Sequence, residues 1–214
     1  MGCGTVLPGL VSPSRSRTTK NPSASVGLSN ANVAFVMMAM RNAPRSPAAL
    51  TIGKQTFWPD LHTLDGLFRA AQIPFPATEE IALAGRTADG IGFLTALGAS
   101  SVSEMDASDY EGAALVHDLN SPVPSQLHDT CDFIYDGGSL EHIFDVPEVF
   151  RNYGRLLRRG GVLAVSTSAN NQCGHGFYQF SPELIYRYFC PQNGWVGTKV
   201  FFAITWGSPR DSGR

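Results

Sequence analysis

Acidic and amide side chains recur directly after short apolar segments of this 214-residue chain. Each segment has the composition of a buried β-strand, and the polar residues follow at its carboxyl end. Carboxylates there can accept hydrogen bonds from ribose hydroxyls or an adenine amino group, and glycines let the backbone approach a ligand closely. In chain order, the residues are Gly53 and Lys54, then Asp106, then Asp118, Leu119 and Asn120, then Asp136, Gly137 and Gly138, and then Ser168, Ala169, Asn170 and Asn171.

Several side chains beside these segments are candidates for proton transfer. Glu141 and His142 are adjacent, and adjacent residues on a helix point apart, so the pair is not expected to act on one atom. An equally good interpretation is that one of them packs and the other caps. Asp136, Glu141, His142 and His175 are separate candidates for a general base. The spacings of His117 and His175 match no metal-ligand template, so the sequence predicts no metal site.

Strands and helices alternate along most of the chain, which predicts an α/β fold. The pattern favours a doubly wound, Rossmann-like, mostly parallel sheet between two layers of helices. Ligands of such sheets bind at the carboxyl ends of the strands, where the polar residues above would meet. Strands are expected over residues 48–53, 101–105, 114–117, 133–135, 162–166 and 200–205; helices over 60–72, 88–98, 146–157 and 181–189; and a short helical turn over 109–113.

The beginning of the chain differs in composition from the rest. Residues 1–59 hold six basic residues and no acid, whereas residues 60–214 hold ten basic and eighteen acidic residues; +6 and −8 return the net charge of −2. The first 29 residues are rich in Ser, Pro and Gly and show no period, which predicts disorder. A short helix is expected from Ser29 or Asn30 to Arg41. We therefore expect a basic tail over 1–46, then a folded domain over 47–214.

Charge, cysteine content and hydropathy limit the classes of partner and compartment. A net charge of −2 argues against binding of the whole chain to nucleic acid. The four cysteines form no CxxC pair, which favours a reduced, cytoplasmic protein. No apolar run approaches the roughly 18–20 residues of a membrane helix. The acid-free first 30 residues also fit a transit peptide, and a flexible tail is the simpler interpretation.

Residues 132–165 resemble class I S-adenosylmethionine-dependent methyltransferases. In that family the fourth strand ends in an acidic residue, and a Leu-Glu-His-like segment, a helix and a Leu-Leu-x-x-Gly-Gly turn follow. Leu140-Glu141-His142 and the segment from Leu156 to Gly161 match this pattern. Residues 175–183 are similar to the segment after the fifth strand in some small members. The resemblance extends over about residues 48–205.

The resemblance implies S-adenosylmethionine as cofactor, a small-molecule methyl acceptor, and a role for each strand-end residue. Asp106 would bind the ribose hydroxyls, and Asp118 and Leu119 would contact the adenine ring. Gly53 would lie under the methionine part of the cofactor. Asp136 would face the methyl donor and acceptor, and with His142 it is the candidate for catalysis.

Three departures from the family pattern leave a second hypothesis open. Only Gly53 remains of the usual glycine-rich loop, and the larger Gln55 and Phe57 follow it. Residues 58–87 look like an insertion, and the sheet would lack its last strand. An open sheet edge of that kind favours pairing with a partner or with a second copy of the chain. The alternative to an active methyltransferase is thus an inactive binding or scaffold module. A nucleotide-binding oxidoreductase is a weaker third hypothesis, since Gly-x-Gly-x-x-Gly is missing.

Overall fold

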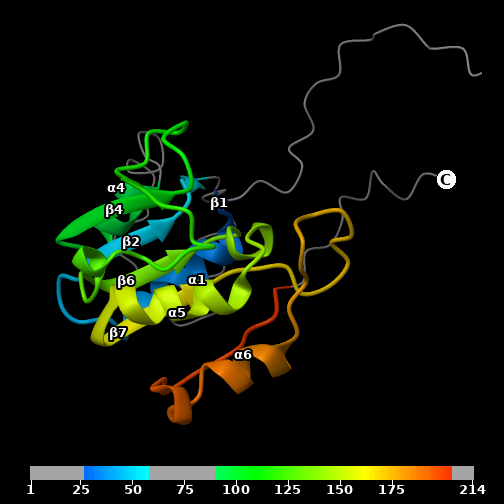
Figure 1. Cartoon of the computed structure of the whole chain (residues 1–214). Helices are drawn as coiled ribbons and strands as arrows, with labels where there is room; N and C mark the ends of the chain where they lie inside the picture. Colours follow the sequence, from blue (N-terminus) through cyan, green and yellow to red (C-terminus); the bar gives the residue numbers. More distant parts are fainter. Residues whose placement is uncertain (1–26, 58–89, 204–214) are drawn as a thin grey trace, which may run out of the picture.

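A parallel five-stranded sheet forms the centre of the molecule (Figure 1). The structure is a computed structural model that describes residues 27–57 and 90–203. The strands lie in the order β5-β4-β2-β6-β7, and every neighbouring pair is parallel. The predicted α/β fold is therefore confirmed. The bounds are β2 (Ala48–Ile52), β4 (Ser101–Asp106), β5 (Leu115–Val116), β6 (Cys131–Asp136) and β7 (Leu157–Val165).

The chain winds outward from the middle of this sheet in two directions. From β2 it passes to β4 and β5 on one side, then returns to β6 on the other side of β2 and continues to β7. Counted from β2, the order is 3-2-1-4-5, as in Rossmann-type folds, with the switch point between β2 and β6. In the register, Ile52 lies opposite both Met105 and Asp136, so the carboxyl ends of β2, β4 and β6 are level.

Helices cover both faces of the sheet, and a two-stranded parallel sheet of β1 and β3 lies beside it. The helices α1 and α4 contribute to one apolar cluster, and α5 and α6 contribute to another. The bounds are β1 (Gly27–Leu28), α1 (Asn30–Met40), β3 (Thr56–Phe57), α4 (Gly90–Ala96), α5 (Val146–Leu156) and α6 (Pro182–Tyr188), with the 3-10 turns η1 (Ser125–Leu127), η2 (Leu140–His142) and η3 (Pro191–Asn193).

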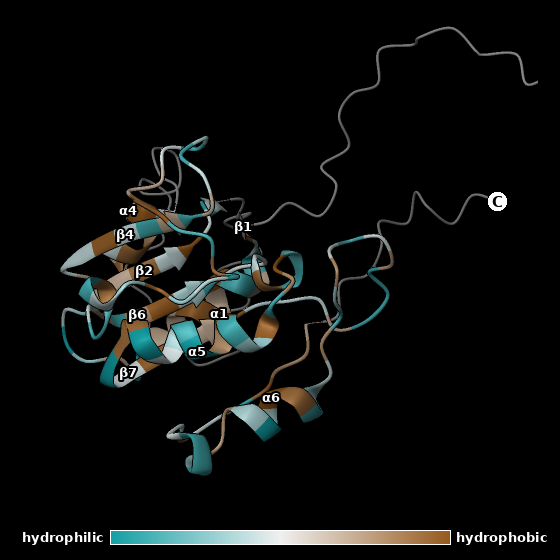
Figure 2. Cartoon of the chain, in the orientation of Figure 1, coloured by the Kyte–Doolittle hydropathy of each residue, from teal (hydrophilic) through white to brown (hydrophobic). Residues whose placement is uncertain are grey.

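Alternation along the strands divides the core between the two faces. Leu50 and Ile52 belong to the cluster that α5 covers, whereas Ala49 belongs to the cluster under α1 and α4. Phe133 and Ile134 of β6 divide in the same way. Figure 2 shows the polar, teal residues of α5 on its outer side, whereas α1 and α4 are mostly apolar and brown. The three-layer arrangement thus follows because successive side chains of each buried strand point to opposite faces of the sheet, and each face is covered by helices.

The helix starts follow the capping residues of the sequence. Ser29, Asp145 and Ser181 are the N-caps of α1, α5 and α6, and each side chain accepts a backbone N–H in the first turn. The expected helix after Ser29 is confirmed, and its residues Val33 and Val36 are fully buried. Helix α1 therefore packs on the same sheet as the rest of the fold. The division of the chain at about residue 46 stays a prediction.

Some local expectations were wrong or lie outside the described residues. Gly27 and Leu28, predicted to be disordered, form β1, because Leu28 is buried in the core. Residues 109–113 form a turn without a helix, and residues 200–203 form no strand. The predicted helix over 60–72 and the whole of the predicted insertion over 58–87 belong to the undescribed part. Among the described residues, no helix is long and apolar enough to cross a membrane.

Candidate functional site

A cavity of about 490 Å³ opens at the carboxyl ends of β2, β4, β5 and β6. This volume lies within the range of about 300–1,000 Å³ of small-molecule sites, and the place is the switch point of the sheet. Of the predicted site residues, the cavity brings together Gly53, Asp106, Asp118, Leu119 and His142. The wall is completed by Ile52, Lys54, Thr56, Met105, Ala107, Glu111, His117, Asn120, Gly138, Ser139 and Ile143.

Gly53 lies where the backbone leaves β2 and turns under the cavity. Its φ of +70° is in the left-handed region, and its N–H donates to the Met105 carbonyl over 2.7 Å. A Cβ at this position would lie 2.8 Å from the Ser139 hydroxyl oxygen, which itself donates to the Ile52 carbonyl. Both the conformation and the space therefore require glycine here.

Gln55 does not obstruct the cavity, although it stands where the resemblance leads one to expect a glycine. Its side chain is fully buried, and its Nε2 donates to the carbonyls of Ile52 and Gly53. The side chain packs against Gly90 and Gly137, where a Cβ would meet it at 2.7 and 2.1 Å. It thus lies beneath the loop, and the space above Gly53 stays open. The side chain of Phe57 lies outside the described residues.

Two carboxylates line the cavity from neighbouring strand ends. Asp106, half-buried at the end of β4, accepts the Ser108 N–H through Oδ1. Asp118 is exposed and accepts both the backbone N–H and the side-chain amide of Asn120. The backbone N–H of Asn120 is the main reason that the pKa of Asp118 lies below its ordinary value. Asp118 is therefore ionised at neutral pH, where it can accept hydrogen bonds from a ligand.

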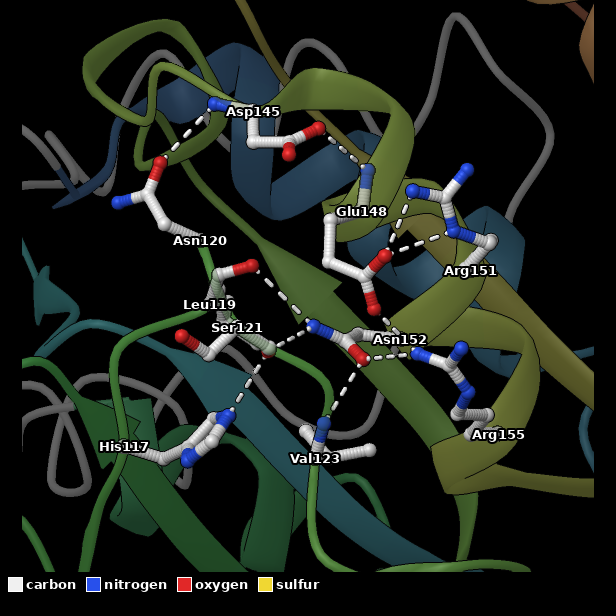
Figure 3. A network of polar contacts seen from close by, with 10 residues as sticks. All are labelled: His117, Leu119, Asn120, Ser121, Val123, Asp145, Glu148, Arg151, Asn152 and Arg155. Atoms are coloured by element: carbon white, nitrogen blue, oxygen red, sulfur yellow. Dashed lines mark hydrogen bonds and ion pairs between the residues drawn. The ribbon is translucent and has the colours of Figure 1, made fainter.

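Asn152 of α5 holds the loop that carries Leu119 and Asn120 (Figure 3). This fully buried amide donates to the carbonyls of Leu119 and Ser121 over 3.2 and 2.8 Å, and it accepts the Val123 N–H over 3.0 Å. Every polar group of the side chain is thus used on one short loop. The loop forms a cavity wall without secondary structure of its own, so Asn152 fixes its shape.

A charged network on α5 supports the same wall (Figure 3). Arg155 donates to the Asn152 amide oxygen over 2.7 Å and to Glu148, which also pairs with Arg151. The hydrogen bond from Arg155 is the main reason that the pKa of Glu148 lies below its ordinary value. The Asp145 N–H donates to the Asn120 side chain. The loop after β5 is therefore hydrogen-bonded to α5 at two places, at the N-cap Asp145 and at Asn152.

Asp136 does not line the cavity, although the resemblance leads one to expect that it faces the methyl donor and acceptor. The residue is fully buried; Oδ1 accepts the N–H groups of Gly138 and Ser139, and Oδ2 accepts the Tyr153 hydroxyl. Burial raises the pKa of Asp136 to about 6. The carboxylate shapes the loop after β6 from below, and that loop supplies Gly138 and Ser139 to the cavity wall.

Glu141, His142 and His175 lie together at one side of the cavity. Their potential ligand atoms all lie within 4.8 Å of one another, and His175 Nε2 is 3.5 Å from Glu141 Oε1. The two imidazole rings meet edge to face, with centroids 4.9 Å apart. His142 alone of the three lines the cavity. Three of the four candidate bases are thus neighbours, while Asp136 lies beneath them in the core.

Two contributors to the site were missed by reasoning on the sequence. Tyr153 lies on the apolar face of α5, and its hydroxyl contact with Asp136 could not be foreseen from spacing. Asn152 carried a signal, because it lies three residues after Val149 and four before Leu156, inside the apolar face. A polar residue in such a face needs buried partners, which here are the carbonyls of the loop.

Comparison with known proteins gives a weak likeness. No protein-family model matches the chain, and it matches no curated protein. A similar solved structure is the crystal structure of the trans-methyltransferase CalH in complex with SAH, at 16% identity and a TM-score of 0.33. The match covers 61% of this chain and 34% of the other, so it spans about a third of that chain's length. A likeness at this level carries no assignment of family or activity. The fold and cavity define a Rossmann-type α/β protein.

Proposed function

We propose that the chain is an S-adenosylmethionine-dependent methyltransferase that acts on a small-molecule acceptor. One observation carries the proposal: a single cavity at the switch point is lined by Gly53, Asp106, Asp118 and Leu119 in their order along three strand ends. These are the positions to which the resemblance gives the methionine, ribose and adenine parts of the cofactor. Because Gly53 has no side chain, its backbone is open to the cavity, which suits a ligand that approaches the backbone closely.

The residues around the cavity suit the three parts of this cofactor. Asp106 can accept hydrogen bonds from both ribose hydroxyls, and the apolar Leu119 offers a surface for the adenine ring. Lys54 donates to the Glu111 carbonyl over 3.4 Å across the mouth. Its ammonium group would lie near the carboxylate of the methionine part. The cofactor would thus extend from β2 across β4 to the loop after β5.

Methyl transfer needs positioning more than acid–base catalysis. When bound, S-adenosylmethionine supplies an activated methyl group: the acceptor's electron pair forms the new bond to carbon, and the carbon–sulfur electrons return to sulfur as a neutral thioether. If the acceptor carries a proton, His142 on the cavity wall is the base that would take it. Asp136 holds the loop of Gly138 and Ser139 and does not touch the acceptor.

Calorimetric titration of the full chain with S-adenosylmethionine and S-adenosylhomocysteine tests the proposal. We expect micromolar binding that Asp106→Ala weakens by tenfold or more, because it removes the ribose acceptors. Asp109→Ala is the matched control, since Asp109 is an exposed acid three residues further on that does not line the cavity. Millimolar binding, or equal losses in both variants, would contradict the proposal.

A binding module without transfer activity is the second candidate. It is favoured by the burial of Asp136, which removes one of the two predicted catalytic groups from the cavity. In that case S-adenosylmethionine would bind with the same affinity and the same dependence on Asp106. A chromatographic assay for S-adenosylhomocysteine, run with a panel of phenol, amine and carboxylate acceptors, distinguishes the two. Product that His142→Ala abolishes supports the enzyme, and none with any acceptor supports the binding module.

A further inference from the structure

We infer that Glu141, His142 and His175 form a site for one divalent transition-metal ion beside the cavity. Their ligand atoms lie within 4.8 Å of one another, although His175 is more than thirty residues from the other two. Two imidazoles and a carboxylate form a common ligand set for zinc and related ions, with further positions open to water or substrate. The site does not depend on whether the cavity binds S-adenosylmethionine.

The distances require only small side-chain movements to bind an ion. At metal–ligand bonds of about 2.0–2.2 Å, tetrahedral ligand atoms are about 3.3–3.5 Å apart. His175 Nε2 and Glu141 Oε1, at 3.5 Å, already meet that spacing. His142 is exposed, so its ring is free to turn toward the pair. Its ligand nitrogen lies within 4.8 Å of the ligand atoms of Glu141 and His175, and its ring meets that of His175 edge to face, so a rotation of the His142 side chain would complete the set.

The surroundings of Glu141 favour a cation at this place. The residue is 3% exposed, and within the described residues no lysine or arginine pairs with it. Its Oε2 accepts the Thr167 hydroxyl over 2.7 Å, which leaves Oε1 directed at His175. A buried carboxylate without a cation is costly, and a bound divalent ion would offset that cost. A hydrogen bond such as that from Thr167 orients a metal ligand without itself touching the ion.

Backbone contacts hold the two parts of the site together. The loop after β7 lies on η2, where the Phe177 N–H donates to the Glu141 carbonyl over 2.7 Å. Gly176 has a φ of +72°, and a Cβ there would lie 2.6 Å from the same carbonyl oxygen. The close approach that glycine permits thus brings His175 next to Glu141. The ligands are prepositioned by the backbone.

The ion would lie beside the cavity, because His142 belongs to both. A His142 nitrogen that binds the ion cannot also take a proton, so His142 would serve as the base only in the metal-free chain. Two nitrogen ligands favour zinc, iron, cobalt or nickel over magnesium or calcium, which prefer oxygen. The remaining coordination positions would accept an oxygen atom of a small molecule held in the cavity. The class of ligand that fits is therefore one with a hydroxyl, carbonyl or carboxylate oxygen.

Metal titration of the full chain tests the site without any assay of activity. After dialysis against EDTA, the protein is titrated with Zn²⁺ by calorimetry and with Co²⁺ by visible absorption. We expect one ion per chain and a cobalt spectrum of four or five ligands. His175→Ala and Glu141→Gln should each weaken binding more than tenfold, whereas His128→Ala should bind as the parent does. His128 is the matched control, since its ring contacts the Val123 carbonyl away from the cluster.

Thr167→Val tests whether the site acts as a whole. It keeps all three ligands and removes the hydroxyl that orients Glu141, and we expect metal affinity to fall by about 10–100-fold. Circular dichroism and melting in EDTA establish that each variant is folded. Absence of stoichiometric binding, or equal binding by the parent and His175→Ala, would overturn the inference. S-adenosylmethionine titration in EDTA is the separate measure of the proposed function, so either proposal can fail alone.

Discussion

Tyr153 donates its phenolic hydrogen to the carboxylate of Asp136, with 2.5 Å between Oη and Oδ2. Neither residue has any exposed surface. The other carboxylate oxygen accepts the Ser139 N–H over 2.7 Å, so Asp136 joins α5 to the loop after β6. Through this buried contact, a residue at a strand end supports a wall of the cavity without lining it.

The stability of the fold should fall with rising pH because of Asp136. Its pKa is about 6 in the fold against an ordinary value of 3.8, chiefly through burial. Between these values the folded chain keeps the proton that the unfolded chain loses, so the free energy of unfolding decreases, by at most about 3 kcal/mol. Asp136→Asn removes this dependence. Urea unfolding of both proteins at pH 4 to 7 should give a difference that changes with pH; a constant difference would contradict it.

Tyr153→Phe should destabilise the fold and move the titration of Asp136 upward. The hydroxyl is a hydrogen-bond donor to the carboxylate and lowers the pKa of Asp136, in opposition to burial. Its loss costs about 1–3 kcal/mol and shifts the pH-dependent part of unfolding to higher pH. Thermal melts across the same pH range measure both effects. Tyr178→Phe is the control, since its hydroxyl donates to the Phe144 carbonyl in an exposed contact and should leave the pH profile unchanged.

Asn152→Ala should weaken ligand binding and stability together. It leaves the Leu119 carbonyl and the Val123 N–H without their partner and removes one of the two contacts of the Ser121 carbonyl, at a cost of about 2–4 kcal/mol. Asn152→Asp keeps the shape but places an acceptor opposite two carbonyls, and should be no better. Urea unfolding and calorimetry with S-adenosylmethionine check this. Asn193→Ala, which loses one exposed contact, should change neither.

Gly53→Ala should be destabilising for two separable reasons. The left-handed φ costs an L-residue about 1–2 kcal/mol, and the new Cβ meets the Ser139 hydroxyl at 2.8 Å. Gly53→Ala/Ser139→Ala removes the second cause and keeps the first. A double-mutant cycle of unfolding free energies should show that Gly53→Ala costs less in the Ser139→Ala background. An equal cost in both backgrounds would mean that the steric clash between the new Cβ and the Ser139 hydroxyl does not contribute to the loss of stability.

The sequence predicted the sheet and most of the cavity because both follow from local patterns. Strands of alternating burial at known spacing define the carboxyl edge, so Gly53, Asp106 and Asp118 could be placed on it. The direction of Asp136 was not predictable, since it depends on a turn in which the carboxylate accepts the next N–H groups.

The contact between His175 and Glu141 depends on how the loop after β7 packs against η2. No spacing along the chain encodes that contact, because it is decided by tertiary packing. A buried role for Asn152 could in principle be predicted from the sequence, because it is a polar residue inside an apolar helical face. Its partners, however, are carbonyl groups of a loop without regular structure, which only the fold identifies.

Consecutive residues of α5 support opposite walls of the cavity. Asn152 holds the loop after β5, and Tyr153 holds the loop after β6 through Asp136. The two walls therefore belong to one cooperative unit whose opening is governed by a single turn of helix. In hydrogen exchange, the amides of Val123 and Ser139 should share one opening free energy even though they lie in separate loops. A ligand that spans both walls would slow exchange at both by the same factor.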